Sequence, residues 1–149
     1  MDKTIVTNKK AFHDYFIEQT FEAGIILEGN EVKSLRLGNV NLNDSYAFLA
    51  KDGIIYLSGA HISPYSKGSY FNPDPRRDRI LLLNKTEIRK IRSKTLQKGY
   101  TLVPLKLYFK QGLVKVELGI AKGKELHDKR ETLKEKDMKR AIERDTKSY

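Results

Sequence analysis

The fold of this chain is decided where an alternating strand pattern stops, at Gly119-Ile120-Ala121-Lys122-Gly123-Lys124-Glu125-Leu126-His127-Asp128-Lys129-Arg130. Before this stretch, apolar and polar residues alternate as in a half-buried strand. After it, large aliphatic residues are sparse and do not recur at the spacing of a core-facing helix. We therefore expect residues 1–121 to fold as one domain and residues 122–149 to form a tail that takes its structure from a partner.

The charge of the chain indicates a polyanionic partner. Its 149 residues carry 29 Lys and Arg against 19 Asp and Glu, a net charge of +10. Residues 122–149 contain 10 of the basic and 7 of the acidic side chains, so residues 1–121 carry most of the excess. A basic excess of this size favours nucleic acid as the partner. The alternative is the solvated surface of an ordinary basic protein.

The composition and the first residues of the chain also indicate its cellular compartment. The chain has no cysteine, which excludes disulfides and thiolate metal sites. Its first residues lack the apolar core of a signal peptide, and no run approaches the ~18 apolar residues of a membrane helix. We expect a soluble cytoplasmic protein that does not contact a membrane.

Catalytic and metal-binding patterns are not found in the sequence. The three histidines, His13, His61 and His127, have no spacing that would bring two of them to one metal ion. The segment 119–124 superficially resembles a phosphate loop, but it has three residues rather than four between its glycines and Glu125 in place of Ser or Thr. We expect no enzymatic activity, no metal and no cofactor.

Three short helices are predicted. The first starts at Lys9 after Asn8 as its cap, with Phe12 and Phe16 as its buried edge. The second covers residues 31–37 and ends at a glycine, and the third follows a capping box at residues 84–87, with a face that includes Leu96.

On the second helix, Lys33 and Arg36 are three residues apart and form one cationic stripe. Such a stripe is able to bind RNA phosphates, and it is equally compatible with a solvated helix face. The sequence leaves both readings open.

The remaining segments read as strands. A strand starts at Phe21 with Glu22 on its outward side, and Asp52-Gly53 marks a hairpin between residues 45–50 and 54–60. A buried run covers residues 80–83, and a last hairpin joins residues 100–110 to 113–121, with Lys115 facing outward. Five or six strands with three short helices predict an α+β fold, a small antiparallel β-barrel of the oligonucleotide-binding type. The long loop between residues 61 and 79 is of a length that is usually functional or mobile.

Several motifs occur here in one order over residues 8–130. They are Asn8-Lys9-Lys10-Ala11-Phe12-His13-Asp14-Tyr15, Phe21-Glu22-Ala23-Gly24, Glu31-Val32-Lys33-Ser34-Leu35-Arg36, Pro75-Arg76-Arg77-Asp78-Arg79, Gly123-Lys124 and His127-Asp128-Lys129-Arg130. Together they resemble the SsrA-binding protein (small protein B) family, the partner of transfer-messenger RNA in bacterial trans-translation. The chain departs from the family pattern at Glu125, where relatives commonly have a second lysine.

The resemblance implies a protein that binds the tRNA-like domain of transfer-messenger RNA and delivers the RNA to stalled ribosomes for rescue and peptide tagging. In this family the barrel stands in for the anticodon arm that the RNA lacks. The tail enters the empty mRNA channel near the decoding centre and becomes helical there. Elongation factor Tu and alanyl-tRNA synthetase are then indirect partners through the RNA. The alternative is a generic single-stranded-RNA-binding or ribosome-associated barrel protein.

The resemblance also assigns residues. It implies RNA contact for Asn8, Glu22, Leu82 and Lys115, and ribosome contact for Gly123, Lys124, His127, Asp128, Lys129 and Arg130. Asn8 has an equally good reading as a plain helix cap. For Leu82 the residues favour a core leucine, which is the usual role in such an apolar run, and its RNA contact rests on the resemblance alone. An acid on an RNA-binding face accepts hydrogen bonds from a base amino group or a 2′-hydroxyl, which is the role expected of Glu22. His127 is placed to stack on an exposed rRNA base, or else it is a solvated side chain.

The tail itself contains Glu-to-Lys pairs at i and i+4, each worth ~0.2–0.5 kcal/mol of helix stability. That is too little for a free helix without an apolar stripe. We expect the tail to be disordered in the free protein and helical on the ribosome.

Overall fold

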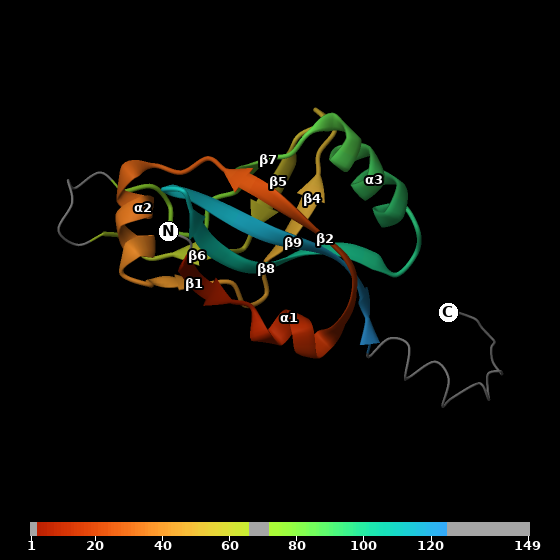
Figure 1. Ribbon diagram of the computed structural model, residues 1–149, viewed down its shortest axis with the longest axis horizontal. Coiled ribbons are helices and arrows are strands. Elements are labelled where there is room, and N and C mark those ends of the chain that lie inside the picture. Colours follow the sequence, from red (N-terminus) through yellow and green to blue (C-terminus); the bar gives the residue numbers. More distant parts are fainter. Residues whose placement is uncertain (1–2, 66–71, 125–149) are drawn as a thin grey trace.

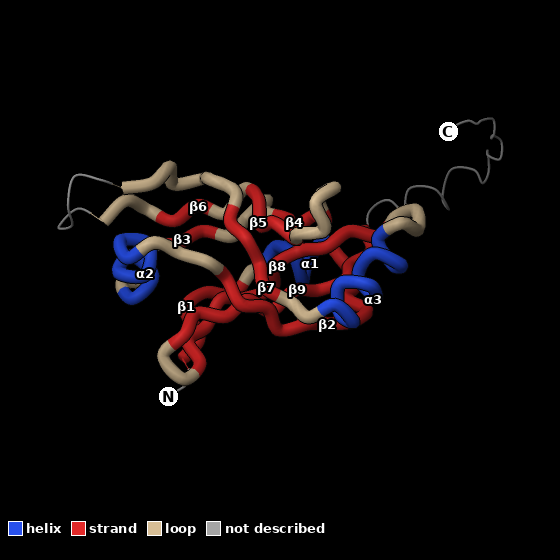
Figure 2. Tube along the Cα trace, turned by 90° about the horizontal axis from the view of Figure 1, so that it is seen from above, coloured by secondary structure: helices blue, strands red, loops and turns tan. Residues whose placement is uncertain are grey.

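The computed structural model describes residues 3–65 and 72–124. Within them lie three helices and nine strands. The helices are α1 (Lys9–Asp14), α2 (Gly29–Arg36) and α3 (Lys85–Thr95). The strands are β1 (Lys3–Thr7), β2 (Tyr15–Ile25), β3 (Val40–Asn41), β4 (Tyr46–Leu49), β5 (Ile55–Ser58), β6 (His61–Ile62), β7 (Arg79–Leu82), β8 (Tyr100–Lys110) and β9 (Leu113–Gly123). Figures 1 and 2 show α2 at one end of the molecule and α3 at the other, with the long strands between them.

The main sheet closes on itself. Its seven strands follow the order β1-β8-β4-β5-β7-β2-β9, and β8 also pairs with β9. The pairings from β8 through β4, β5, β7, β2 and β9 therefore return to β8 as a closed ring, to which β1 is added at β8. All pairs in this sheet are antiparallel. The predicted α+β class is confirmed.

Two apolar clusters stabilise the ring. The larger one contains the inward-facing residues of the strands together with Leu35 of α2 and Ile91 of α3. The smaller one lies beneath α1, where Ala11 packs on Val103, Leu105 and Ala121. Strand β9 therefore buries residues on both of its faces near its end, which its alternating pattern did not indicate.

Gly119 belongs to that doubly buried part of β9. Its sequence position predicted an outward residue, but it is buried. A Cβ atom at this position would lie 2.8 Å from Leu105 Cδ1 and 3.1 Å from Ile17 Cγ2. The close approach of β2 and β8 to β9 thus requires a residue without a side chain here.

Local signals placed most elements correctly. The third helix has the expected capping box between Asn84 and Glu87, and the Asp52-Gly53 hairpin joins β4 to β5. In the last hairpin, Gln111 and Gly112 have φ of 52° and 79°. These positive values at both central residues are those of the tight turn that the twist of two paired strands favours.

The limits of some strands differ from the prediction. Strand β2 begins at Tyr15, β9 continues to Gly123, and β1 was not predicted. Because residues 119–122 are paired with both β2 and β8, and residue 123 with β2, this segment cannot form the phosphate loop that was considered for it.

Three apolar residues expected in the core are exposed. Phe12 and Phe16 are 46% and 55% exposed, because α1 ends at Asp14 and Phe16 belongs to β2 instead of the same helix face. Leu96 is 80% exposed because it follows the last residue of α3. Ala11 is the residue of α1 that packs inward.

A buried ion pair connects α2 to β7. Glu31 is 3% exposed and Arg79 is fully buried. Arg79 Nε donates to Glu31 Oε2 at 2.9 Å, and Arg77 Nη2 donates to Glu31 Oε1 at 2.6 Å. The other N–H groups of Arg79 reach the carbonyl oxygens of Ala60, Arg77 and Pro75 at 2.9–3.1 Å. Two arginines of the long 61–79 loop region are therefore used inside the protein.

The pair also sets the ionisation of Glu31. Burial alone would raise the pKa of this carboxyl, but hydrogen bonds from Arg77, the Glu28 N–H and Arg79 hold its pKa below the ordinary value. Glu31 is therefore ionised wherever the protein is folded near neutral pH.

Among the described residues, no helix has both the length and the apolar character needed to cross a membrane.

Replacing Glu31 is expected to destabilise the fold strongly. Glu31→Gln leaves the Arg79 guanidinium buried without its counter-charge, a change that costs about 3–5 kcal/mol. Because the folded-state pKa of Glu31 is lowered, its stabilisation is present above the unfolded value of about 4.3 and is lost as the pH falls through the folded value. Denaturant unfolding between pH 3 and pH 7 should show a smaller decrease on acidification in the variant than in the wild type.

The exposed pair between Glu18 and Lys94 provides the control for Glu31→Gln. Glu18→Gln should change the free energy of unfolding little, because solvated ion pairs contribute little. Equal effects of the two substitutions would contradict the role given to the buried pair.

Candidate nucleic-acid interface

Three of the predicted RNA-binding residues lie together on neighbouring strands. Gly24 of β2 is the direct partner of Leu82 on β7 and of Lys115 on β9. Directly opposed residues point to the same side of a sheet, so Leu82 and Lys115 flank the position of Gly24. Glu22 lies two residues before Gly24 and therefore points to the same side. We call this group, Glu22, Gly24, Leu82 and Lys115, the β2–β7–β9 face.

Leu82 is part of this face and not of the core. Its side chain is 54% exposed, which overturns its reading as a core leucine, while its neighbour Leu81 is buried. A Cβ atom on Gly24 would lie 3.3 Å from Leu82 Cβ, so the absence of a side chain there lets the leucine lie over β2. Leu82 thus offers an apolar surface beside a lysine and a carboxylate.

Glu22 is held in position by two residues of β8. Tyr108 Oη donates to Glu22 Oε2 at 2.5 Å, and Lys110 Nζ approaches the same oxygen at 3.2 Å. The hydrogen bond from Tyr108 and then that from Lys110 lower the pKa of the Glu22 carboxyl. An ionised carboxylate is purely an acceptor, so the arrangement suits a ligand that donates hydrogen bonds.

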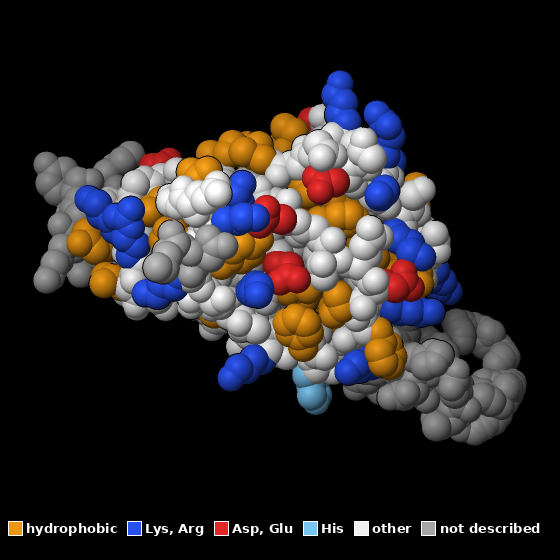
Figure 3. Space-filling view, viewed as in Figure 1, with side chains coloured by type: hydrophobic (Ala, Val, Ile, Leu, Met, Phe, Trp, Pro, Cys, Tyr) orange, Lys and Arg blue, Asp and Glu red, His pale blue; other side chains and the backbone are white. Residues whose placement is uncertain are grey.

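A polar recess adjoins Glu22. It has a volume of about 450 Å³ and is lined by Lys3, Thr4, Glu22, Lys106, Tyr108, Lys110 and Glu117. Lys106 Nζ lies 3.7 Å from Glu117 Oε1 and 5.8 Å from the centre of the Tyr108 ring. Figure 3 shows acidic and basic side chains interspersed over β2, β8 and β9.

The residues of β8 in this recess were missed by the sequence analysis. Lys106, Tyr108 and Lys110 are spaced two apart, which places them on one side of the strand. That spacing alone predicts that the three side chains share one side of the strand. What the sequence could not supply was the pairing of β2 with β9, which brings Glu22 next to Glu117 and so next to this side of the last hairpin.

Asn8 lies elsewhere and is used inside the protein. It is 3% exposed, and its Oδ1 accepts from the Ala11 N–H at 3.1 Å as the cap of α1. Its Nδ2 donates to the carbonyl oxygens of Pro104 at 2.9 Å and Leu42 at 3.3 Å. The capping role is confirmed, and direct contact of Asn8 with RNA stays a prediction.

Lys33 and Arg36 are exposed on α2, at the left end of Figure 1 beyond the end of β2. Lys33 Nζ lies 5.6 Å from the centre of the Tyr65 ring. The cationic stripe expected on this helix is therefore present on the surface, although it belongs to a different element from the β2–β7–β9 face.

The predicted ribosome contacts are described only in part. Gly123 is the last residue of β9, paired with Tyr15, and Lys124 Nζ donates to the Phe12 carbonyl oxygen at 3.4 Å. His127, Asp128, Lys129 and Arg130 lie outside the described residues.

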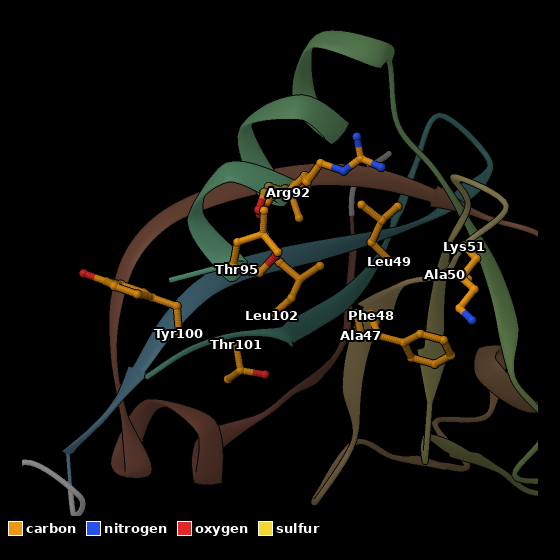
Figure 4. A pocket seen from close by; sticks show the side chains of 12 residues that line it. Ala47, Phe48, Leu49, Ala50, Lys51, Arg92, Thr95, Tyr100, Thr101 and Leu102 are labelled. Atoms are coloured by element: carbon orange, nitrogen blue, oxygen red, sulfur yellow. The ribbon is translucent and has the colours of Figure 1, made fainter. Parts of the chain in front are cut away.

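A separate cleft lies between α3 and the end of β4. It has a volume of about 400 Å³, and Figure 4 shows Leu49, Thr95 and Leu102 directed toward it from different elements. Its lining is mainly apolar, with Lys51, Arg92 and Tyr100 as the larger polar side chains. Its residues do not include any of those predicted to bind RNA.

Comparisons with known proteins agree with one another. A family model described as "SmpB protein" matches residues 5–148. The SsrA-binding protein of Geobacter metallireducens is 60% identical over 141 residues, which cover 95% of this chain and 92% of that protein. The SsrA-binding protein of Caldicellulosiruptor saccharolyticus is 56% identical over 147 residues, which cover 99% of this chain and 92% of that protein. A solved structure described as "tmRNA-SmpB: a journey to the center of the bacterial ribosome" has a TM-score of 0.71 and 51% identity, with 93% of this chain and 94% of that chain covered.

The closed ring of strands, its mixed-charge outer face and the basic excess define a small RNA-binding protein of the α+β class. Within that class the matches are specific and extend over nearly the whole chain. The chain belongs to the SmpB protein family.

The hydrogen bond from Tyr108 is expected to control the ionisation of Glu22. In Tyr108→Phe, the pKa of the Glu22 carboxyl should rise toward its ordinary value, because the largest cause of its lowering is removed. NMR titration of the side-chain carboxyl resonance would measure this shift. Tyr56→Phe, which removes a hydroxyl bonded to Asp52 on a different strand, is the control and should leave the Glu22 titration unchanged. A Glu22 pKa that is the same in Tyr108→Phe and in the wild type would contradict the described geometry.

Proposed function

We propose that this chain binds the tRNA-like domain of transfer-messenger RNA and delivers that RNA to stalled ribosomes for trans-translation. The relatives are SsrA-binding proteins, and the structural neighbour is a transfer-messenger RNA–SmpB assembly of the bacterial ribosome. The observation that carries the proposal is the gathering of Glu22, Leu82 and Lys115 on neighbouring strands around Gly24.

The fold supports a binding role of this kind. We take the closed ring of six strands to be a small β-barrel of the oligonucleotide-binding type, an architecture that presents a curved strand face to nucleic acid. A binding protein without enzymatic activity, working in the cytoplasm, fits this architecture.

The β2–β7–β9 face combines three complementary chemistries. Lys115 supplies a cation for a phosphate, which sets affinity without reading sequence. Glu22 supplies an ionised acceptor, which repels phosphate and favours a base amino group or a 2′-hydroxyl. Leu82 supplies an apolar contact for a sugar or a base. A folded RNA that presents backbone, hydroxyl and base edge together is the ligand that uses all three.

The barrel and the tail have separate roles in this account, as in the family. The barrel, residues 1–121, takes the place of the anticodon arm that the RNA lacks, and the tail, residues 122–149, probes the empty mRNA channel and becomes helical there. Gly123, Lys124, His127, Asp128, Lys129 and Arg130 make the ribosome contacts in this account. Elongation factor Tu and alanyl-tRNA synthetase act with the chain indirectly, through the RNA.

The proposal predicts a specific loss of RNA affinity in Lys115→Ala. Binding of the tRNA-like domain should weaken at every salt concentration, and the salt slope should decrease by about 1, because one phosphate contact is removed. Fluorescence anisotropy at two or more salt concentrations measures both quantities. Lys51→Ala, at the exposed β4–β5 turn, is the matched control and should retain wild-type binding.

The same assay separates the proposal from a generic RNA-binding function. Wild-type protein should prefer transfer-messenger RNA over bulk tRNA and unstructured mRNA at both low and high salt. Equal affinity for the three RNAs would favour a generic single-stranded-RNA-binding protein instead.

Removing positive charge from the tail should abolish peptide tagging on the ribosome without changing the affinity for transfer-messenger RNA. The double variant Lys129→Ala, Arg130→Ala should bind transfer-messenger RNA almost as the wild type does and fail to support peptide tagging on stalled ribosomes in a reconstituted translation assay. Loss of RNA affinity in this variant would instead place the tail in the RNA-binding site.

A further inference from the structure

The cleft between α3 and the end of β4 is an apolar hollow that is open to solvent. Its floor is made of core side chains, Ile91 of α3 and Leu102 of β8, which are 0% and 2% exposed. Leu49 and Leu96 also line it, and Leu96 is 80% exposed. Its volume of about 400 Å³ lies within the range of binding pockets in proteins. Exposed apolar surface in a hollow of this size usually marks a binding site.

Two cations line the cleft without a counter-charge. Lys51, after the end of β4, and Arg92 of α3 are both exposed, and Figure 4 shows them on these different elements. Neither takes part in an ion pair with another described residue, whereas Lys94 on the same helix is paired with Glu18. Among the described residues that line the cleft there is no Asp or Glu. The cleft therefore combines an apolar interior with positive charge at its edge.

This combination is poorly suited to a nucleotide. Thr95 Oγ1 donates to a carbonyl oxygen of its own helix at 2.8 Å, and Tyr100 Oη donates to Glu18 at 2.8 Å, so both hydroxyls are already used. The Phe48 ring is stacked on Tyr56, with 5.7 Å between the ring centres. Few groups remain for the polar edges of a base, and buried polar groups without partners are unfavourable.

Charge also disfavours a second copy of this chain, or its own tail, in the cleft. The chain has a net charge of +10, and residues 122–149 contain 10 basic against 7 acidic side chains. Either occupant would bring further positive charge to Lys51 and Arg92. The complement of the cleft is an acidic segment of another protein that carries an apolar side chain.

The cleft lies away from the β2–β7–β9 face. In the ring of strands β8-β4-β5-β7-β2-β9, β4 is three strands from β2 in either direction. Leu49 and Lys51 are therefore across the ring from Glu22 and Gly24. A partner in the cleft and an RNA on the β2–β7–β9 face can be bound at the same time.

We propose that the cleft binds a protein partner through a short acidic segment, with a large apolar side chain inserted between α3 and β4 and Asp or Glu side chains at Lys51 and Arg92. An apolar anchor in a pocket, surrounded by charged groups at the rim, is the usual anatomy of a protein interface. The complementary charges steer the encounter and exclude basic partners. Binding in the cleft does not require RNA, so the inference goes beyond the proposed function and does not rest on it.

The test uses the full chain and peptide probes. Twelve-residue peptides are selected from a random phage-displayed library on immobilised wild-type protein and are then synthesised with a fluorescent label. The selected peptides should contain Asp or Glu beside Leu, Phe or Trp, and each should lose most of its affinity when its large apolar residue is replaced by alanine. A library that yields no binding peptide, or peptides that bind through their charge alone, would overturn the inference.

Two variants of the chain locate the binding site of the selected peptides. Arg92→Glu and Leu96→Asp should each weaken binding by about ten-fold or more, because each removes a contact of the cleft. Both side chains are exposed, so the variants should fold as the wild type does. The matched controls are Arg89→Glu, exposed on α3 outside the cleft lining, and Leu113→Asp, 61% exposed at the start of β9. The controls should bind the peptides nearly as the wild type does, and an equal loss in a variant and its control would overturn the inference.

A second measurement shows where the peptide lies. In backbone amide NMR spectra of the full chain, addition of a selected peptide should shift the resonances of Leu49, Thr95 and Leu102 and leave those of Glu22 and Lys115 unchanged. Shifts centred on any surface other than the cleft would overturn the inference.

The inference and the proposed function fail separately. Arg92→Glu and Arg89→Glu change the net charge equally, so they should bind the tRNA-like domain with equal affinity. Weaker RNA binding in Arg92→Glu than in Arg89→Glu would assign the cleft to RNA and overturn the inference. If Lys115→Ala binds the tRNA-like domain normally while Arg92→Glu loses the peptides, the proposed function is wrong and the peptide site stands. The reverse result removes the peptide site and leaves the proposed function intact.

Discussion

The fold depends on one buried ion pair, that of Glu31 with Arg79. A carboxylate and a guanidinium taken out of water destabilise a protein unless they satisfy each other, and here the guanidinium also reaches three backbone carbonyl oxygens. Those oxygens belong to Ala60, Arg77 and Pro75, so the pair joins α2, the end of the β5–β6 connection and the segment before β7.

The ion pair also helps to position the binding surface, because it holds the start of β7. Arg79 is the first residue of β7, and the same strand places Leu82 beside Gly24. A displaced β7 would separate Leu82 from Glu22 and Lys115, while α2 would lose one of its attachments to the rest of the protein, the other being the buried Leu35. The residues that hold the face together are therefore buried and distant from it.

Strands β2 and β9 then organise the proposed binding surface. Their ladder runs from Tyr15 with Gly123 to Gly24 with Lys115. Because neighbouring residues of a strand point to opposite sides, one ladder carries Lys115 on one side and Lys122 on the other. The side of the ladder that carries Lys115 and Glu117 is the outer one, because Val116 and Leu118 on the other side are buried.

The sequence predicted what depends on short-range signals. The capping box at Asn84 and Glu87, the Asp52-Gly53 turn and the Asn8 cap are each contained within a few residues, and each was confirmed. The outward positions of Glu22 and Lys115 followed from alternation along one strand.

What depends on distant pairing was not predictable in this way. The run at residues 80–83 has no alternation, so nothing in it distinguished the exposed Leu82 from the buried Leu81. Glu31 resembled a surface acid because its partners Arg77 and Arg79 are 46 and 48 residues away. Tyr108 was overlooked as a partner of Glu22 for the same reason, since 86 residues separate them.

The central claim is that transfer-messenger RNA is bound by the β2–β7–β9 face and not by another basic surface of the protein. Titration of isotope-labelled full chain with the tRNA-like domain, followed by backbone amide NMR, tests it most directly. The account predicts that the largest shifts fall on Glu22, Gly24, Leu82 and Lys115, with α3 little changed. Shifts centred on α3, with the β2–β7–β9 face unaffected, would contradict it.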